Sequence, residues 1–122
     1  MIRLDLPYPP TINHYYGVRG KGRYIKPEGL EFRKIVAQAI EPKGMEKIEG
    51  NVAIFIQIYP PDNRKRDIDN VLKALLDALT HAGAWVDDSQ IHDLHIIKGK
   101  PRKGHSGTTV FISEMNKPDM PR

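Results

Sequence analysis

The sequence predicts an α+β fold, a small mixed β-sheet with two main helices packed on it, in the order β-α-β-α-β-β. Three observations predict it. Two segments carry apolar residues at helical spacing, and four others alternate or are rich in β-branched residues. Prolines and glycines separate most of these segments. In a chain of 122 residues we expect a single domain over 1–114, followed by a frayed tail at 115–122.

The first elements follow from local patterns. Residues 2–6 alternate between apolar and polar, as in a half-covered strand, and prolines end it. Residues 11–16 are expected to be irregular, and the Gly-, Arg- and Lys-rich segment 17–26 to be an exposed, mobile loop. A helix is expected over 27–40, because proline suits a first turn and glutamates suit the positive end of the helix dipole.

The second half begins with residues 51–59, whose nearly continuous apolar, β-branched character predicts a central strand. The helix expected over 68–82 has a nearly complete apolar stripe, and Gly83 is expected to end it in the left-handed conformation. Residues 87–90 have the composition of a turn. We then expect a strand over 91–98, a basic hairpin loop over 99–107 and a returning strand over 108–113.

Composition excludes several classes of protein. No apolar run approaches the ~20 residues that cross a membrane, and we expect no export because the N-terminus lacks a signal pattern. The absence of cysteine excludes disulfides and thiol chemistry and is compatible with the cytoplasm, where we expect the protein to act. The net charge of +4 favours a polyanionic partner. Positive charge concentrates in residues 19–26, 64–66 and 98–103.

Two aspartates stand where extended chain is expected to meet the second helix. Asp67 and Asp69 are two residues apart, so they point the same way only where extended chain meets the helix, and a pair sharing a metal ion belongs there. Asp67 could instead cap the helix, and Asp69 could improve the dipole or pair with Lys73. These alternatives explain neither the basic triplet 64–66 nor the presence of Asn70 and Lys73 on the same exposed side.

A second acidic point is Asp87-Asp88, in the expected turn. If this turn folds back beside Asp67, three carboxylates meet, and such hard oxygen ligands suit Mg²⁺ bridged to phosphate. Two metal ions can clamp the attacking water and the leaving oxygen of a phosphodiester, and a nearby lysine can stabilise the charge that develops. The pattern indicates metal-dependent hydrolysis of a nucleic acid, with the basic flanks holding the polyanion.

Residues 60–79 and 85–91, with an Arg-x-Asp-x-Asp-Asn core and a following lysine, resemble the RusA family of Holliday junction resolvases. Residues 6–16 are similar to that family's opening, and the likeness spans nearly the whole chain. The resemblance implies a homodimeric endonuclease, often of phage or prophage origin. Such an enzyme uses Mg²⁺ or Mn²⁺ to nick four-way DNA junctions symmetrically in recombination and repair. It also implies that Asp67, Asp69 and Asp88 bind metal and that Lys73 is catalytic, with Asp87 a lesser candidate.

Basic side chains in the flanks and loops are expected to contact DNA phosphates. These candidates are Arg64, Lys65, Arg66 and Asn70 beside the acidic pair, and Arg19, Lys21, Arg23, Lys98, Lys100, Arg102 and Lys103 in the loops. Asn13, Tyr15 and Tyr16 are further candidates; a tyrosine can stack on a base or a deoxyribose, although packing explains the two tyrosines equally well. His92 and His95 would face opposite sides of a strand, which disfavours a shared zinc site.

Two other functions stay open on the residues alone. One is a basic nucleic-acid-binding module without catalysis, whose aspartates are caps and ion pairs. The other is a metal-dependent nuclease that acts on linear or flapped DNA. Incubation of a labelled junction with Mg²⁺ or with EDTA separates the first from an enzyme, and comparison of a junction with linear duplex separates the second.

Overall fold

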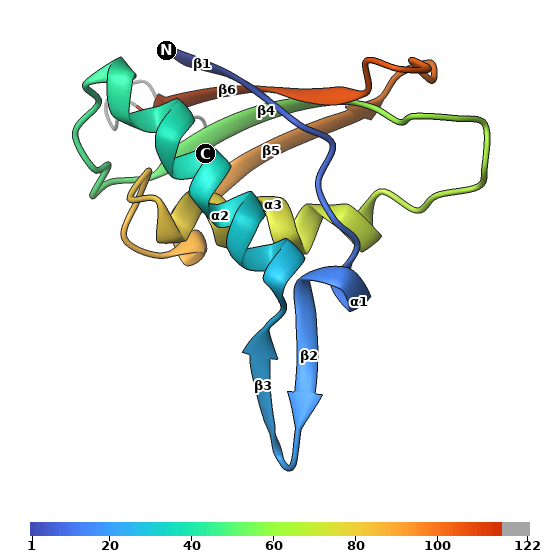
Figure 1. Cartoon of the computed structure of the whole chain (residues 1–122). Helices are drawn as coiled ribbons and strands as arrows, with labels where there is room; N and C mark the ends of the chain where they lie inside the picture. Colours follow the sequence, from blue (N-terminus) through green and yellow to red (C-terminus); the bar gives the residue numbers. More distant parts are fainter. Residues whose placement is uncertain (116–122) are drawn as a thin grey trace.

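A four-stranded mixed sheet with two long helices on one face makes up most of the molecule (Figure 1). The structure is a computed structural model and describes residues 1–115. The strands β1 (Ile2–Leu6), β4 (Val52–Tyr59), β5 (Ile91–Lys98) and β6 (Gly107–Glu114) lie in the order β1-β6-β4-β5. The helices are α2 (Pro27–Ile40) and α3 (Asp69–His81). The predicted α+β class and both predicted helices are confirmed.

The central strand is β4, as predicted. It pairs antiparallel with β6 and parallel with β5, and α3 provides the crossover between β4 and β5. Every second residue of β4 is buried in the core against the helices, where Leu75 of α3 is also fully buried. Only one face of the strand is buried in this way, and Phe55 on the other face is half-exposed. The helices therefore cover a single side of the sheet.

The segment between β5 and β6 is not the predicted hairpin. Both strands pair with β4, on opposite sides, so the segment crosses the carboxyl end of β4. The backbone N–H of Gly99 donates to Ile58 O at 2.8 Å, and that of Arg102 donates to Pro60 O at 2.8 Å. The Arg102 guanidinium lies 3.5 Å from the centroid of the Tyr59 ring. The hairpin prediction was wrong because the sequence between β5 and β6 does not show that β4 lies between these two strands in the sheet.

The segment predicted as a mobile loop contains an antiparallel hairpin, β2 (Tyr16–Arg19) and β3 (Gly22–Ile25). It projects from the body of the molecule (Figure 1) and follows a short helix, α1 (Ile12–Tyr15), where irregular chain was predicted. Gly20 makes the turn with φ 60°. The Tyr24 ring covers Gly17 and carries the Arg19 guanidinium 4.7 Å from its centroid. These cross-strand contacts stabilise the β2–β3 hairpin, which the polar composition of the segment did not predict.

Two 3₁₀ turns complete the described chain, η1 (Glu41–Lys43) and η2 (Asp88–Gln90), the latter in the predicted turn. Gly83 ends α3 with φ 89°, as predicted. The tail predicted for 115–122 lies outside the described residues except for Met115, whose backbone N–H donates to Asn51 O at 2.8 Å. Within residues 1–115, no helix is both long and apolar enough to span a bilayer.

Candidate active site

The acidic pair lies where the loop after β4 enters α3. The Asp67 carbonyl accepts a hydrogen bond from the Asn70 N–H at 3.1 Å, so the first helical turn begins at Asp67. The residue at the N-cap is Ile68, and no side chain caps the helix. Among residues 1–115, the exposed carboxylates of Asp67 and Asp69 accept no hydrogen bond and make no ion pair. Capping and pairing with Lys73 therefore do not account for them.

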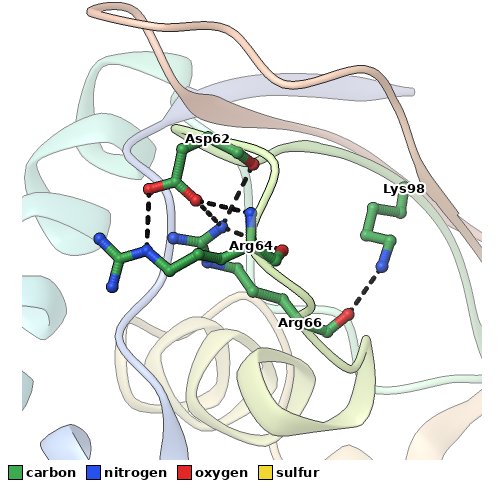
Figure 2. Close-up of polar contacts among 4 residues, drawn as sticks. All are labelled: Asp62, Arg64, Arg66 and Lys98. Atoms are coloured by element: carbon green, nitrogen blue, oxygen red, sulfur yellow. Dashed lines mark hydrogen bonds and ion pairs between the residues drawn. The ribbon is translucent and has the colours of Figure 1, made fainter.

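Asp62 organises the basic loop that leads to this pair (Figure 2). Its Oδ1 accepts hydrogen bonds from Arg66 Nη1 at 2.6 Å and from the Arg64 N–H at 2.9 Å. Its Oδ2 lies 3.4 Å from Arg64 Nε. The hydrogen bond from Arg66 holds the pKa of the Asp62 carboxyl well below its usual range. Asp62 is therefore ionised at neutral pH and offsets part of the positive charge of the loop.

The role of Asp62 was not predicted from the sequence. The signal that could have found it is its spacing of four residues from Arg66, a spacing at which opposite charges meet when the chain turns. The consequence is a division of roles within the basic triplet. The Arg66 side chain is only 20% exposed and is held by Asp62, whereas that of Arg64 is 82% exposed. Arg66 fixes the loop, and Arg64 and the exposed Lys65 remain able to contact a ligand.

A surface hollow of about 420 Å³ joins the acidic and basic residues. Its lining residues are Thr11, Arg64, Lys65, Arg66, Asp67 and Asn70. A second hollow of about 690 Å³ is formed by the same loop and by the segment after β5. Its lining residues are Pro61, Asp62, Asn63, Lys100, Pro101 and Lys103. Two of the three basic segments found in the sequence therefore meet at the carboxyl end of β4.

The third basic segment lies apart, on the projecting hairpin. Arg19, Lys21 and Arg23 are exposed there and line neither hollow. The Arg23 guanidinium lies 4.2 Å from the centroid of the half-buried Tyr16 ring. At the base of the hairpin, the backbone carbonyl of the exposed Asn13 accepts a hydrogen bond from Lys26 Nζ at 2.7 Å. The hairpin is thus a separate basic surface.

Tyr15 belongs to the core, which overturns its candidacy as a DNA-stacking residue. The side chain is fully buried, and its hydroxyl donates to Asp77 and accepts a hydrogen bond from Arg33 Nε at 2.7 Å. Arg33 Nη2 also donates to Asp77 Oδ2 at 2.8 Å. Burial alone would raise the pKa of the Asp77 carboxyl, but the hydrogen bonds from Tyr15 and Arg33 outweigh it and lower that pKa. This network joins α1, α2 and α3.

The two aspartates of the predicted turn differ in their partners. The Asp87 side chain accepts a hydrogen bond from the Ser89 N–H at 3.0 Å, and the Gln90 side chain accepts one from the Asp87 N–H at 2.8 Å. This reciprocal cap starts η2, and the hydrogen bond from Ser89 lowers the pKa of the Asp87 carboxyl. The half-exposed Asp88 carboxylate accepts no hydrogen bond from residues 1–115. Of the two, Asp88 is the one with a carboxylate available to a ligand.

Within one chain, this turn does not fold back beside Asp67. Asp88 precedes Ile91, which pairs with Val52 at the amino ends of the parallel strands, whereas Asp67 and Asp69 follow their carboxyl ends (Figure 1). The 13 residues of α3 separate the two positions, a length of about 20 Å at 1.5 Å per residue. No group of three histidine, aspartate or glutamate side chains within residues 1–115 is placed to hold a metal ion.

The fold places an acidic pair without protein partners at a helix entrance, beside a basic hollow, as expected for a protein that acts on a polyanion. The family model for endodeoxyribonuclease RusA matches residues 7–113. The chain therefore belongs to the RusA endodeoxyribonuclease family, and the resemblance found in the sequence is confirmed.

Curated relatives agree with this assignment. The chain is 42% identical over 95 residues to the crossover junction endodeoxyribonuclease rusA of Enterobacteria phage HK97, covering 77% of this chain and 79% of that protein. It is 39% identical over 113 residues to the protein of the same name from Enterobacteria phage 82, covering 92% and 93%. It is 38% identical, with the same coverage, to crossover junction endodeoxyribonuclease RusA of Escherichia coli K12. The two phage relatives fit the predicted phage or prophage association.

Proposed function

We propose that this protein is a divalent-metal-dependent Holliday junction resolvase that nicks a four-way DNA junction symmetrically. The observation that carries the proposal is the exposed pair Asp67 and Asp69, which have no protein partner in the described chain and adjoin a basic hollow. The name crossover junction endodeoxyribonuclease, borne by its relatives, supports the substrate. The process would be DNA recombination and repair in the cytoplasm.

The acidic pair fits Mg²⁺. Carboxylate oxygens are the hard ligands that Mg²⁺ prefers, and because this ion keeps several waters, few carboxylates plus phosphate oxygens suffice. Mn²⁺ accepts the same ligand type. No cation in residues 1–115 pairs with Asp67 or Asp69, so both carboxylates are available as metal ligands. When bound, the ion would activate water and stabilise the leaving oxygen.

The neighbouring side chains would position the DNA backbone and stabilise the negative charge that develops on the reacting phosphate. Lys73 is exposed one helical turn beyond Asp69, where its ammonium can stabilise negative charge on the reacting phosphate. Arg64, Lys65 and Asn70 of the hollow would hold the backbone beside the scissile bond. Contact with the DNA arms would extend along a basic set formed by Lys98, Lys100, Arg102, Lys103, Arg19, Lys21 and Arg23.

The third carboxylate would come from a second copy of the chain. One copy holds Asp88 at the opposite end of α3 from Asp67, so it does not supply three ligands to one ion. In a two-fold dimer, Asp88 of the partner subunit can complete the site, and the symmetry then creates two such sites. A four-way junction has two-fold symmetry as well, which matches one site to each of two nicked strands.

The test is cleavage of a labelled four-way junction with Mg²⁺, Mn²⁺ or EDTA, alongside linear and flapped duplexes of the same sequence. We expect paired nicks in the junction with metal only. Asp69→Asn should slow nicking by about 10²-fold or more, because metal-assisted stabilisation is worth several kcal/mol. Junction binding, measured by gel shift, should persist or strengthen because a negative charge is removed.

Asp5→Asn is the matched control, since this carboxylate lies on β1 and is 68% exposed. It should cleave at the wild-type rate. Equal cleavage of linear duplex would contradict junction selectivity and favour a general nuclease. Binding without cleavage under every metal condition would favour a non-catalytic binding module.

A further inference from the structure

The loop between β4 and α3 is not held by its own backbone. At its start, the carbonyl of Pro60 accepts a hydrogen bond from the Arg102 N–H at 2.8 Å, and at its end Asp67 begins the first helical turn. Between these two points, residues 61–66 make no hydrogen bond to another backbone group of residues 1–115. A segment of this kind keeps one shape only where side chains hold it. The position of the Asp67 carboxylate therefore depends on the side chains of the loop.

Asp62 and Arg66 close the loop as a clamp (Figure 2). The carboxylate of Asp62 accepts hydrogen bonds from Arg66 Nη1 at 2.6 Å and from the Arg64 N–H at 2.9 Å. Arg66 Nη1 also donates to the backbone carbonyl of Asp62 at 3.3 Å and to that of Arg64 at 3.4 Å. One guanidinium thus joins three acceptors along residues 62–64. Charge-assisted hydrogen bonds such as the first are the strong ones in proteins.

Arg66 connects this clamp to the acidic pair. Its carbonyl accepts a hydrogen bond from Lys98 Nζ at 2.7 Å, so the residue is fixed at its side chain by Asp62 and at its backbone by the end of β5. Asp67 is the next residue, and a turn of the Arg66 backbone would displace the Asp67 carboxylate. A ligand group must be held within about 0.5 Å of its productive position.

Asp62 is unsuited to bind a metal ion itself. Its Oδ1 is engaged by Arg66, and its Oδ2 lies 3.4 Å from Arg64 Nε. Two guanidinium groups at one carboxylate repel a divalent cation and occupy the oxygens that it would need. Asp67, in contrast, accepts no hydrogen bond within residues 1–115. The two carboxylates therefore differ in what they can do: one binds arginine, and the other is available to an ion.

We infer that Asp62 is a positioning residue of the cleavage reaction proposed above, on which this role rests: acting through Arg66, it holds the Asp67 carboxylate where a divalent ion can bind. Asp62 touches neither the metal ion nor the reacting phosphate. Groups that orient metal ligands from behind typically contribute about 10–100-fold to metal affinity or activity.

Trypsin measures whether Asp62 holds the loop. The loop carries three tryptic sites, at Arg64, Lys65 and Arg66, and the hairpin β2–β3 carries an internal reference set of basic residues. Because proteolysis follows the population of the open form, Asp62→Ala should raise cleavage at the loop by about tenfold or more relative to the hairpin. Asp5→Ala is the matched control, since it also removes an exposed carboxylate that is paired with an arginine, 3.2 Å away. Its cleavage pattern should equal that of the wild type.

Metal binding and DNA binding separate a positioning role from a general loss of structure. Titration with Mn²⁺ alone should show an affinity about 10–100-fold weaker in Asp62→Ala than in the wild type. The Mg²⁺ concentration that gives half-maximal nicking should rise by a similar factor. Junction binding in EDTA should be unchanged or stronger, because the substitution removes a negative charge. Weaker junction binding together with a lost thermal transition would overturn the assignment, since the residue would then serve the fold alone.

Two further variants test the path through Arg66. Asp62→Asn keeps an oxygen that can accept from the Arg64 N–H, so it should lose less Mn²⁺ affinity than Asp62→Ala. In an Arg66→Ala background, Asp62→Ala should weaken Mn²⁺ binding by less than about threefold more, because effects within one network are not additive. A full additional loss in that background would overturn the path through Arg66. An opened loop with unchanged Mn²⁺ affinity would overturn the positioning role.

The outcomes also separate this role from the proposed function. If wild-type protein cleaves no junction with any divalent metal while Asp62→Ala opens the loop and weakens Mn²⁺ binding, the resolvase proposal fails and the role of Asp62 in holding Asp67 stands. If wild-type protein resolves junctions and Asp62→Ala equals it in tryptic pattern, Mn²⁺ affinity and nicking, the positioning role fails and the resolvase proposal stands.

Discussion

Individual aspartates of this chain differ in role according to their partners. Asp62 holds two arginines, Asp77 lies in the network beneath α3, and Asp87 caps η2. In contrast, Asp67 and Asp69 accept no hydrogen bond within residues 1–115. A carboxylate with protein partners contributes to stability, whereas an exposed pair without partners is available to a bound cation.

The Asp77 network predicts a loss of stability. Asp77→Ala would leave the Arg33 guanidinium, which is 20% exposed, without its carboxylate. Breaking a fully buried pair costs about 3–5 kcal/mol, and because Asp77 is 27% exposed, we expect solvent screening to reduce the loss to about 2 kcal/mol. Urea unfolding measures it. Asp5→Ala, at an exposed ion pair, should change the free energy of unfolding by less than about 0.5 kcal/mol.

The same network predicts how stability depends on pH. Because folding lowers the pKa of Asp77, its contribution is complete above the ordinary carboxyl pKa of about 4 and is lost as the pH falls through the lower folded value. The difference in unfolding free energy between wild type and Asp77→Asn should therefore be constant near neutral pH and shrink below about pH 4. A difference that grows on acidification would contradict the lowered pKa.

At the scale of elements, helix α2 closely approaches the base of the hairpin. Gly29 of α2 is buried, and a Cβ there would lie 2.7 Å from Tyr15 O and 2.7 Å from Ile25 Cγ2. The Lys26 N–H donates to the same Tyr15 carbonyl at 2.9 Å, which joins the two ends of the hairpin. The glycine therefore permits α2 to pack against both ends of the projecting segment.

Gly29→Ala should destabilise the protein by about 1–3 kcal/mol, because the clash is partly with backbone that cannot rotate away. Thermal or urea unfolding measures the change. Gly22→Ala is the control within β3, where the nearest atom to an added Cβ is Arg19 O at 3.8 Å. We expect a change within about 0.5 kcal/mol there. Equal effects at the two positions would show that close packing at Gly29 does not matter.

At the scale of the whole molecule, the acidic residues lie at opposite ends of α3, and a dimer is the arrangement that would reunite them. Mixing two inactive variants tests this. In a dimer of Asp69→Asn with Asp88→Asn, one composite site carries both lesions and the other carries none. Half of randomly formed dimers are mixed and each has one intact site, so we expect about a quarter of wild-type nicking, on one strand at a time.

The control mixes Asp69→Asn with Asp67→Asn. Each composite site then carries one lesion at its Asp67 or Asp69, so no mixed dimer has an intact site and nicking should not return. Recovery of activity in this control would mean that the sites are not shared as proposed. No recovery with Asp88→Asn, after subunit exchange is verified by mass spectrometry, would mean that each chain uses its own Asp88.

The sequence alone determined the features that depend on neighbouring residues. Periodicity predicted both long helices and the central strand, and Gly83 predicted the end of α3, because each depends on residues within a turn or two of the chain. The motif around Asp67 and Asp69 identified the family for the same reason: its residues are consecutive. It also placed the pair at a helix entrance, and the structure agrees.

The tertiary structure decided what depends on distant partners. It placed β4 between β5 and β6, put Tyr15 in the core and paired the hairpin strands, because strand order and burial come from contacts that no local pattern encodes. It also set Asp88 about one helix length from Asp67. A motif can indicate which carboxylates belong to one site. Because α3 is rigid and separates Asp67 from Asp88 by its own length, a single chain does not bring these carboxylates together.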